Sequence, residues 1–514
     1  MTEQRASSEY FVDDLDLEPT TPPVGPRFIG DGLVSWTWHS LFQRRNTVAI
    51  LLVVVYIVWF SHLSLALYYG YSQPPYDLAI FDQGMWLITH FHVPFVTVMG
   101  RNLFGDHTSF VLFLFAPIYR LFPEPQGLLV LQTLLLAAPA VPIYVLARKY
   151  IKSTAIATAL VAVYLLNPLI QQGNLDQFHP EAFQPLFISL AIYAALERRS
   201  RLLVVTVVLA LMVKEDAALL VIPLGLWVAA RRDRRLGTWI VAGSVAYAMV
   251  ANWVIIPSLL GSSSIYTGRI PFGGVSGLLA TLFRRPGQLW SYLGSQGRPF
   301  YLWQIGSTAG FAFLLAPEIA VIGILVVAEN MISNDPYMHQ ILYQYSIVLA
   351  AVLVLGTLYA IAQQSSLWRR NTLIVLALVG AVWTCALWGY APFSKNKVYD
   401  TVPSSSMAAL NALEKALPPD ASVAAWYPLV AHLDARSQIY VWPNPFSASN
   451  WGLLNDTGVR LPVASQVQYL LLPDPLAPDE NPAVFSQISS DYRLVSSGGG
   501  FGLYEQRNAA VVGS

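Results

Sequence analysis

The chain has 514 residues, of which 55% are hydrophobic and only 12% charged, whereas about a quarter of an ordinary soluble domain is charged. Lysine plus arginine and aspartate plus glutamate number 30 each, so the charge balance gives no basis for nucleic-acid binding. The single cysteine, Cys385, lies in an apolar run, which excludes a disulfide framework and a cysteine-based metal site.

The first 40 residues are polar and rich in acidic residues and proline, and they lack the apolar core of a cleavable signal peptide. We predict a disordered cytoplasmic tail over residues 1–40. Membrane insertion then begins at the first long apolar run, near residue 46.

About eleven apolar runs predict membrane-spanning helices, because a bilayer core of roughly 30 Å needs about 20 apolar residues in a helix. The expected spans lie near residues 46–69, 126–147, 153–171, 180–197, 201–213, 216–230, 237–259, 299–315, 317–332, 340–361 and 371–391. Together they predict a transmembrane helical bundle over residues 41–395.

Basic residues cluster where each two-span hairpin would return to the cytoplasm. These clusters begin at Arg44, Arg148, Arg198, Arg231 and Arg369. They predict a multi-pass protein of the inner (plasma) membrane with its N-terminus in the cytoplasm and its C-terminus outside. The prediction requires that residues 108–122 do not cross the membrane.

After about residue 396 the composition becomes that of a small soluble α/β domain, which we predict over residues 396–514. The run SSSMAALNALEKAL has the apolar spacing of a helix and ends before Pro418. The runs ASVAAW, QIYVW, VQYLLL, YRLVSS and FGLYEQ predict short strands. The glycines of SSGGGFG predict a hairpin turn rather than a phosphate loop, because they open no helix.

Four polar clusters fall on the predicted outer face, each beside a membrane span. Charged groups at membrane depth cost at least a few kcal/mol unless they face a wet cavity or each other, so a functional interpretation is the default. The clusters are YDLAIFDQGMW, GRNLFGDH, NLDQFHPEAF and VKEDAA, with candidate residues Asp77, Asp82, Gln83, Arg101, Asp106, His107, His179, Glu181, Lys214, Glu215 and Asp216.

Each cluster also has a purely structural interpretation. YDLAIFDQGMW fits an amphipathic helix on the membrane surface, with Asp82 and Gln83 on its polar side. The HPEAF run suits the first turn of a helix, and Lys214 could pair with Glu215 or Asp216 to close a helical hairpin. On the first interpretation, an amide in place of Asp82 should cost little stability.

The predicted outer loop 261–298 carries four arginines on the side of the membrane where such charge is usually sparse. They are Arg269, Arg284, Arg285 and Arg298. Arginine forms bidentate contacts with phosphate, so a lipid head group is a reasonable ligand, and a solvated loop is the alternative.

Taken in order, YDLAIFDQGMW, GRNLFGDHTSF, FHPEAFQP, VKEDAALLV and PPDASVAAWYPLVAHLDARSQIYVWP resemble a family of bacterial and archaeal polytopic membrane proteins of unknown function. The resemblance runs from about residue 45 to 505. That family in turn resembles the GT-C superfamily, integral membrane glycosyltransferases that use polyprenyl-phosphate sugars and place an acidic residue in the first outer loop. Asp82 matches that position, with Asp77 as the alternative.

The resemblance implies transfer of a sugar from a polyprenyl-phosphate donor to an extracytoplasmic glycan, lipid or protein. Such a reaction needs a base, positive groups for the leaving phosphate and a groove open to the bilayer. We predict Asp82 as the base, and Arg101, Lys214 and the loop arginines, Arg269 among them, as phosphate partners. The predicted lining of the site is Gln83, Asp106, His107, His179, Glu181, Glu215 and Asp216.

His107, His179 and Glu181 are also candidate ligands of a divalent metal ion. We predict that His107, His179, Glu181, Glu215 and Asp216 converge on one outer-facing cavity, because isolated polar groups at that depth would be costly.

Two other classes of function stay open. A transporter or lipid flippase would bind its ligand near the midplane and carry internal repeats, whereas these acidic residues gather at the predicted outer end. A non-catalytic envelope assembly factor would leave them without a chemical task.

Overall fold

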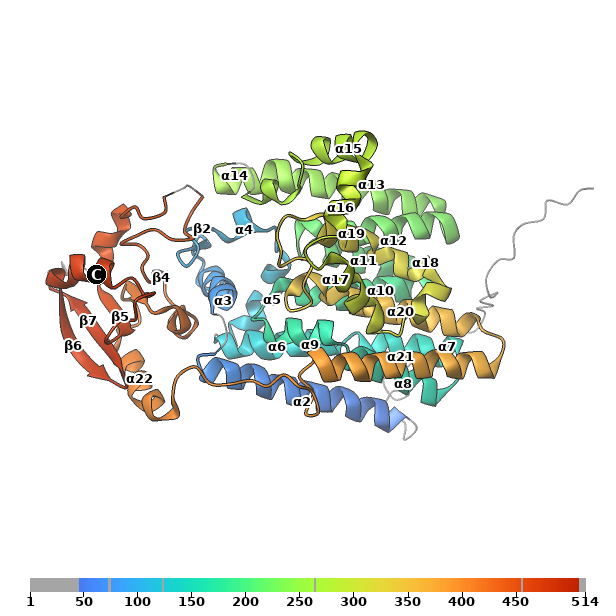
Figure 1. Ribbon diagram of the computed structural model, residues 1–514, viewed down its shortest axis with the longest axis horizontal. Coiled ribbons are helices and arrows are strands. Elements are labelled where there is room, and N and C mark those ends of the chain that lie inside the picture. The colour runs from blue at the N-terminus through green and yellow to red at the C-terminus, as the bar shows by residue number, and fades with distance from the viewer. Residues whose placement is uncertain (1–45, 73–74, 123, 263–264, 454–455, 508–514) are drawn as a thin grey trace, which may run out of the picture. The chain divides into compact units, whose positions relative to one another are not determined.

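The protein is mainly helical, with its strands confined to two small sheets (Figure 1). The structure, a computed structural model, describes residues 46–72, 75–122, 124–262, 265–453 and 456–507, and these all belong to one compact unit. The predicted tail, residues 1–40, lies outside the described residues. The prediction of a helical membrane protein with a small sheet near its C-terminus is confirmed.

Five helical segments of the described chain are long and apolar enough to cross a bilayer. They are α2 (Thr47–Tyr69), α6 and α7 (Pro125–Ala137, Ala140–Tyr150), α13 and α14 (Arg234–Val250, Ile256–Leu260), α20 (Ile347–Gln363) and α21 (Leu367–Trp388). A sixth candidate is the pair α8 and α9 (Thr154–Leu165, Pro168–Leu175), bent by 42°. Pro168 accounts for this bend, because it cannot donate a helical hydrogen bond.

The other apolar runs form helices too short to meet the same criterion. They are α5 (Val111–Tyr119), α10 (Phe183–Leu196), α11 (Ser200–Leu211), α12 (Ala218–Arg231), α15 (Val275–Arg284), α16 (Pro286–Leu293), α17 (Arg298–Ser307), α18 (Pro317–Ala320) and α19 (Ile324–Ile332). Length and composition therefore support five or six spans. The finer count of eleven and the orientation stay predictions.

The YDLAIFDQGMW run folds as helix α3 (Tyr76–Thr89), as predicted. A two-stranded sheet, β1 (Phe95–Val96) with β2 (Arg101–Asn102), and the short helix α4 (Leu103–Asp106) follow it. The expectation that Asp82 and Gln83 lie on a solvated polar side of α3 is wrong, whereas the position of α3 at the membrane surface stays a prediction. Both side chains are 0% exposed, because residues far along the chain cover this face.

These covering residues belong to the C-terminal region, which we define as residues 404–506. Besides α22 (Ser404–Ala416) and α23 (Pro482–Ile488), it contains a sheet with the strand order β4-β3-β5-β7-β6. The strands are β3 (Val423–Ala425), β4 (Ile439–Val441), β5 (Tyr469–Pro473), β6 (Tyr492–Gly498) and β7 (Phe501–Gln506). Strand β3 is parallel to β4 and β5, and β7 is antiparallel to β5 and β6.

All five predicted strand runs and the predicted helix are present in the C-terminal region. The chain reverses between β6 and β7 at Gly499 and Gly500, whose φ angles are +64° and +85°. Residues with a Cβ rarely adopt such angles, so the glycines serve the predicted hairpin turn. The domain boundary near residue 396 stays a prediction.

The C-terminal region packs on the end of α2 and on the segment after β1 through polar and aromatic contacts. The Thr97 hydroxyl donates to the Ile439 carbonyl at 2.7 Å and accepts the Ile439 N–H at 2.9 Å. The His432 ring stacks between Tyr68 and Tyr71, with centroids 4.0 and 4.3 Å away. The C-terminal region and the helices thus share one continuous set of contacts.

Candidate functional site

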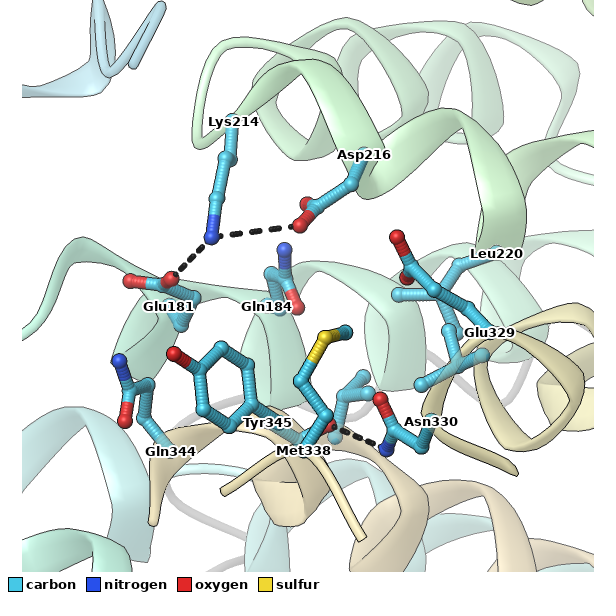
Figure 2. A pocket seen from close by; sticks show the side chains of 12 residues that line it. Glu181, Gln184, Lys214, Asp216, Leu220, Glu329, Asn330, Met338, Gln344 and Tyr345 are labelled. Atoms are coloured by element: carbon cyan, nitrogen blue, oxygen red, sulfur yellow. Dashed lines mark hydrogen bonds and ion pairs between the residues drawn. The ribbon is translucent and has the colours of Figure 1, made fainter. Parts of the chain in front are cut away.

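Lys214 lies at the break between α11 and α12 and points into a pocket among the helices. Its ammonium contacts a Glu181 oxygen at 2.8 Å and an Asp216 oxygen at 3.3 Å, and Figure 2 shows the three side chains converging. Lys214 is 4% exposed, and a buried ammonium is costly unless carboxylates pair with it. The predicted pairing of Lys214 with Asp216 is confirmed, and Glu181 joins the pair from the turn that begins α10.

The pocket around Lys214 is lined by charged and amide side chains together with several apolar ones. Its walls also include Gln184, Glu329, Asn330, Gln344 and Tyr345 (Figure 2). Glu329, on α19, is a site residue that the sequence reasoning missed. The signal was present, because an acidic residue inside an expected span is by default functional.

A second polar group adjoins Lys214 through the next residue, Glu215. The Glu215 carboxylate contacts His107 Nδ1 at 2.7 Å and accepts the Thr108 N–H at 3.1 Å. The His107 ring stacks on Tyr266 with a centroid separation of 4.8 Å. Tyr266 in turn donates to Asp106 at 2.9 Å.

A third group surrounds Asp77, in the first turn of α3. The Asp77 carboxylate is 38% exposed and accepts a hydrogen bond from His179 Nε2 at 3.1 Å. Gln177 accepts the backbone N–H groups of Asp77 and Leu78 at 2.7 and 3.1 Å, so the first turn of α3 is held in place. Burial lowers the pKa of His179, but Asp77 and Asp176 outweigh it and raise that pKa to about 9.

Asp176 connects the Asp77 group to the Lys214 pocket. Its carboxylate is close enough to His179 to interact electrostatically and accepts a hydrogen bond from the backbone of Gln344, which lines the pocket. Burial raises the pKa of Asp176 to about 7 although His179 opposes the rise. Both Asp176 Oδ2 and His179 Nδ1 are buried without a hydrogen-bond partner, an arrangement that leaves polar capacity free for a ligand or water.

Asp82, the predicted base, lies in a different environment from Asp77. It accepts a hydrogen bond from the Tyr119 hydroxyl at 3.0 Å, and its other neighbour is the carboxyl group of Asp434 in the C-terminal region. The premise that Asp82 lies on an exposed interfacial helix outside a packed core is therefore wrong, and the small stability cost of an amide at this position stays a prediction. The catalytic role of Asp82 also stays a prediction.

The remaining predicted residues are held by local partners. Gln83 donates to Thr97 at 2.9 Å, and the Arg101 guanidinium contacts Asp106 at 2.8 Å. Arg269 stacks on Tyr266 at 4.1 Å and contacts an Asp335 oxygen at 3.6 Å.

Arg298 differs from the other loop arginines because its side chain is 0% exposed. Its guanidinium donates to the backbone carbonyls of Met331 and Ser333 at 2.7 and 2.9 Å. The interpretation of Arg298 as a phosphate partner is therefore wrong, since backbone oxygens already occupy its donors. Arg284 and Arg285 are exposed.

The three candidate metal ligands do not come together. His107 pairs with Glu215, His179 with Asp77, and Glu181 with Lys214. Across the part of the chain that the structure describes, no three His, Cys, Asp or Glu side chains form a group that could hold a metal ion. The residues therefore do not fit a divalent ion, since the Lys214 ammonium already neutralises its neighbouring carboxylates.

The five residues predicted to converge on one cavity, His107, His179, Glu181, Glu215 and Asp216, lie instead in adjoining groups. Glu181 and Asp216 line the Lys214 pocket itself. Glu215 and His107 form the neighbouring contact on one side, and His179 lies on the other, within electrostatic reach of Glu181.

Comparisons with known proteins identify a family. Residues 72–512 match the model of the family described as predicted membrane protein (DUF2079), so the resemblance to a membrane-protein family of unknown function is confirmed. The apo structure of ArnT from Cupriavidus metallidurans aligns with 90% of this chain and 99% of its own, at 12% identity and a TM-score of 0.42. A TM-score that low does not establish a shared fold. The search of curated proteins found no match.

Proposed function

This chain belongs to the DUF2079 family of predicted membrane proteins, and from this premise we propose that it is a membrane glycosyltransferase. It transfers a sugar from a polyprenyl-phosphate donor to an acceptor hydroxyl outside the cytoplasm. The observation that carries the proposal is the partly exposed carboxylate of Asp77, fixed by His179 and joined through Asp176 to the polar Lys214 pocket.

Asp77 is the base in this proposal. The acceptor hydroxyl is a poor nucleophile and needs a carboxylate that it can reach. Asp77 is 38% exposed on its side chain, whereas Asp82 is 0% exposed. His179 donates to one Asp77 oxygen, which leaves the other oxygen for the acceptor.

The Lys214 pocket binds the donor sugar. Sugar hydroxyl groups can donate to a carboxylate and can both donate to and accept from a side-chain amide. In this pocket Glu329 supplies the carboxylate, and Asn330 and Gln344 supply the amides.

Arg269 stabilises the leaving phosphate. Its guanidinium lies 5.9 Å from the ring centre of Tyr345, a residue of the pocket wall, and its side chain is 27% exposed. In the reaction the acceptor oxygen bonds to the anomeric carbon, the bond from that carbon to the phosphate oxygen breaks, and the phosphate leaves with the electron pair. The acceptor proton passes to Asp77.

A transporter or lipid flippase is the second candidate. It is supported by the same pocket, since buried ionisable groups among apolar helices also mark transport pathways. A transport role requires no base, so it assigns no task to the exposed oxygen of Asp77.

The test compares envelope glycans and lipid-linked sugars in a deletion strain complemented with wild-type protein, Asp77→Asn or the control Asp479→Asn, an exposed acid of the C-terminal region. Asp77→Asn should accumulate a polyprenyl-phosphate sugar and lose one glycan linkage, with transfer lowered by about 10²- to 10⁴-fold. Asp479→Asn should behave as wild type. Undiminished transfer by Asp77→Asn would remove this residue from the mechanism, and a lipid-linked sugar confined to the inner leaflet would favour the flippase.

A further inference from the structure

Asp82 and Asp434 meet where the C-terminal region packs on α3. Asp82 lies in the middle of α3 and is 0% exposed, and Asp434, just after the short helix η9 (Tyr427–His432), is 1% exposed. Their carboxyl groups lie within hydrogen-bonding reach of each other. Two acidic side chains that lie far apart in the sequence are thus buried face to face.

The surroundings supply this pair with few donors and, among the described residues, with no ion-pair partner. Tyr119 donates to Asp82 Oδ1 at 3.0 Å, but Oδ2 of both aspartates is buried without a donor. Arg436 directs its guanidinium to backbone carbonyl oxygens at 2.5–3.4 Å. No ion pair among the described residues includes either carboxyl group.

Two ionised carboxylates cannot be stable in such a contact. Each would carry a buried charge without an ion-pair partner, with only the electrostatic influence of Arg436 on Asp434 to offset it, and the like charges would repel each other in a medium of low dielectric constant. A single proton between the two groups removes one charge and supplies the missing donor for the other group. Neighbouring carboxyl groups then titrate as a pair in two separated steps.

We propose that Asp82 and Asp434 share one proton at neutral pH and that this proton fastens the C-terminal region to α3. The inference concerns how two parts of the chain are held together and is independent of the proposed reaction. The pKa values of the two groups agree with it. Burial raises the pKa of Asp82 to about 6. Burial, and after it the neighbouring Asp82, raise the pKa of Asp434 well above its ordinary value.

The direction of the pH dependence follows from proton binding. Separated aspartates have pKa values of about 3.9 and hold no proton at neutral pH, whereas the docked pair holds one. Docking is therefore strongest at low pH, weakens as the pH rises above about 4, and stops changing once the docked pair has lost its shared proton. The equilibrium between docked and open forms changes about tenfold per pH unit for one proton.

The other titratable groups near the pair do not cause the pH dependence of docking. Tyr68 and Tyr119 are phenols, which stay protonated between pH 6 and 9, and Arg436 stays charged. His432 is neutral in that range, because burial lowers its pKa to about 4. Glu124 acts on Asp82 from an exposed position and favours the shared proton.

The first test detects the proton directly in the full-length protein. Infrared difference spectra of wild type minus Asp434→Asn at pH 7.5 should show the C=O band of one protonated carboxyl group. The asparagine amide can donate to Asp82, so the variant needs no proton in the contact. Asp479→Asn, the exposed control, should give no such band. Absence of the band from the Asp434→Asn difference would overturn the shared proton.

The second test measures docking by the distance between spin labels on Ser291→Cys and Ser486→Cys, two exposed positions, with Cys385→Ala. From pH 6 to pH 9 the distances should shift from one narrow distribution toward longer values. Asp434→Asn, or Asp82→Asn if the former does not fold, should keep the narrow distribution at each pH.

The same pH series of spin-label distances is then measured in proteins that also carry Thr97→Ala. This change removes both hydrogen bonds to Ile439, so it weakens docking and brings the open fraction into a measurable range. In that background the open fraction should rise steeply with pH only while both aspartates are present. An open fraction that is independent of pH, or that rises equally in Asp434→Asn, would overturn the role of the proton in docking.

Discussion

The pocket around Lys214 and the contact around Asp82 both bury carboxyl groups, but they offset the cost by opposite means. In the pocket, an ammonium lies between Glu181 and Asp216. At the contact, Asp82 meets a second acid, Asp434, and neither forms an ion pair among the described residues. The first arrangement pairs carboxylates with a cation, and the second suits a pH-dependent junction in which one of the two carboxyl groups is protonated. Burial alone therefore does not indicate what an acidic residue does; its partners decide.

The largest expected effect comes from removing the cation of the pocket. Lys214→Met leaves Glu181 and Asp216 without a compensating charge, and breaking a buried ion pair costs about 3–5 kcal/mol. The free energy of unfolding in detergent should fall by that amount, and Lys415→Met, at an exposed position, should leave it unchanged. If Lys214→Met were as stable as wild type, the carboxylates of the pocket would not depend on lysine.

A smaller effect is expected from the His179–Asp77 pair. The pKa of His179 is raised to about 9 from an ordinary value of about 6.5. A raised histidine pKa adds stability that is complete below pH 6.5 and is lost as the pH rises through 9, up to about 3 kcal/mol in total. His179→Gln should remove this part of the pH dependence of unfolding. An unchanged pH profile in the variant would show that the histidine is not charged in the folded protein.

A substitution of Thr97 tests how much an uncharged contact near the carboxyl pair contributes to the free energy of unfolding. Thr97→Val keeps the shape of the side chain but leaves the Ile439 N–H and carbonyl without their partner, at a cost of about 1–3 kcal/mol. The loss should be the same at pH 6 and pH 9. A loss that grows with pH would instead couple Thr97 to the Asp82–Asp434 pair.

The smallest effect is expected at an exposed ion pair, which provides the baseline for both buried regions. Arg493 contacts Glu505 at 2.6 Å on the surface of the C-terminal sheet, with 63% of the arginine side chain exposed. Exposed pairs contribute less than about 1 kcal/mol and weaken with salt. Arg493→Gln should therefore change the unfolding free energy by no more than this, and a larger loss would show that solvent does not screen the pair.

The sequence predicted the elements that depend on local patterns. Apolar runs of sufficient length predicted the long helices, whereas α15 and α16 lie in the predicted loop 261–298. Short runs between turn-rich stretches predicted all five strands of the C-terminal sheet, and three glycines predicted its hairpin. The motif clusters also named most of the polar groups, since ionisable residues beside apolar spans are conspicuous. Helical geometry alone separates Asp77 from Asp82, because five positions on an α-helix place two side chains on different faces.

Only the tertiary structure decided which of those faces is covered. Asp434 and Arg436 reach α3 from the other end of the chain, Glu329 joins Lys214 from another helix, and Arg298 turns inward to backbone carbonyls. Spacing and composition report the local period of a helix or strand and the cost of burying a charge. They do not identify the distant segment that buries a side chain. That segment determines whether a carboxyl group such as Asp77 or Asp82 contacts solvent, a cation or another acid.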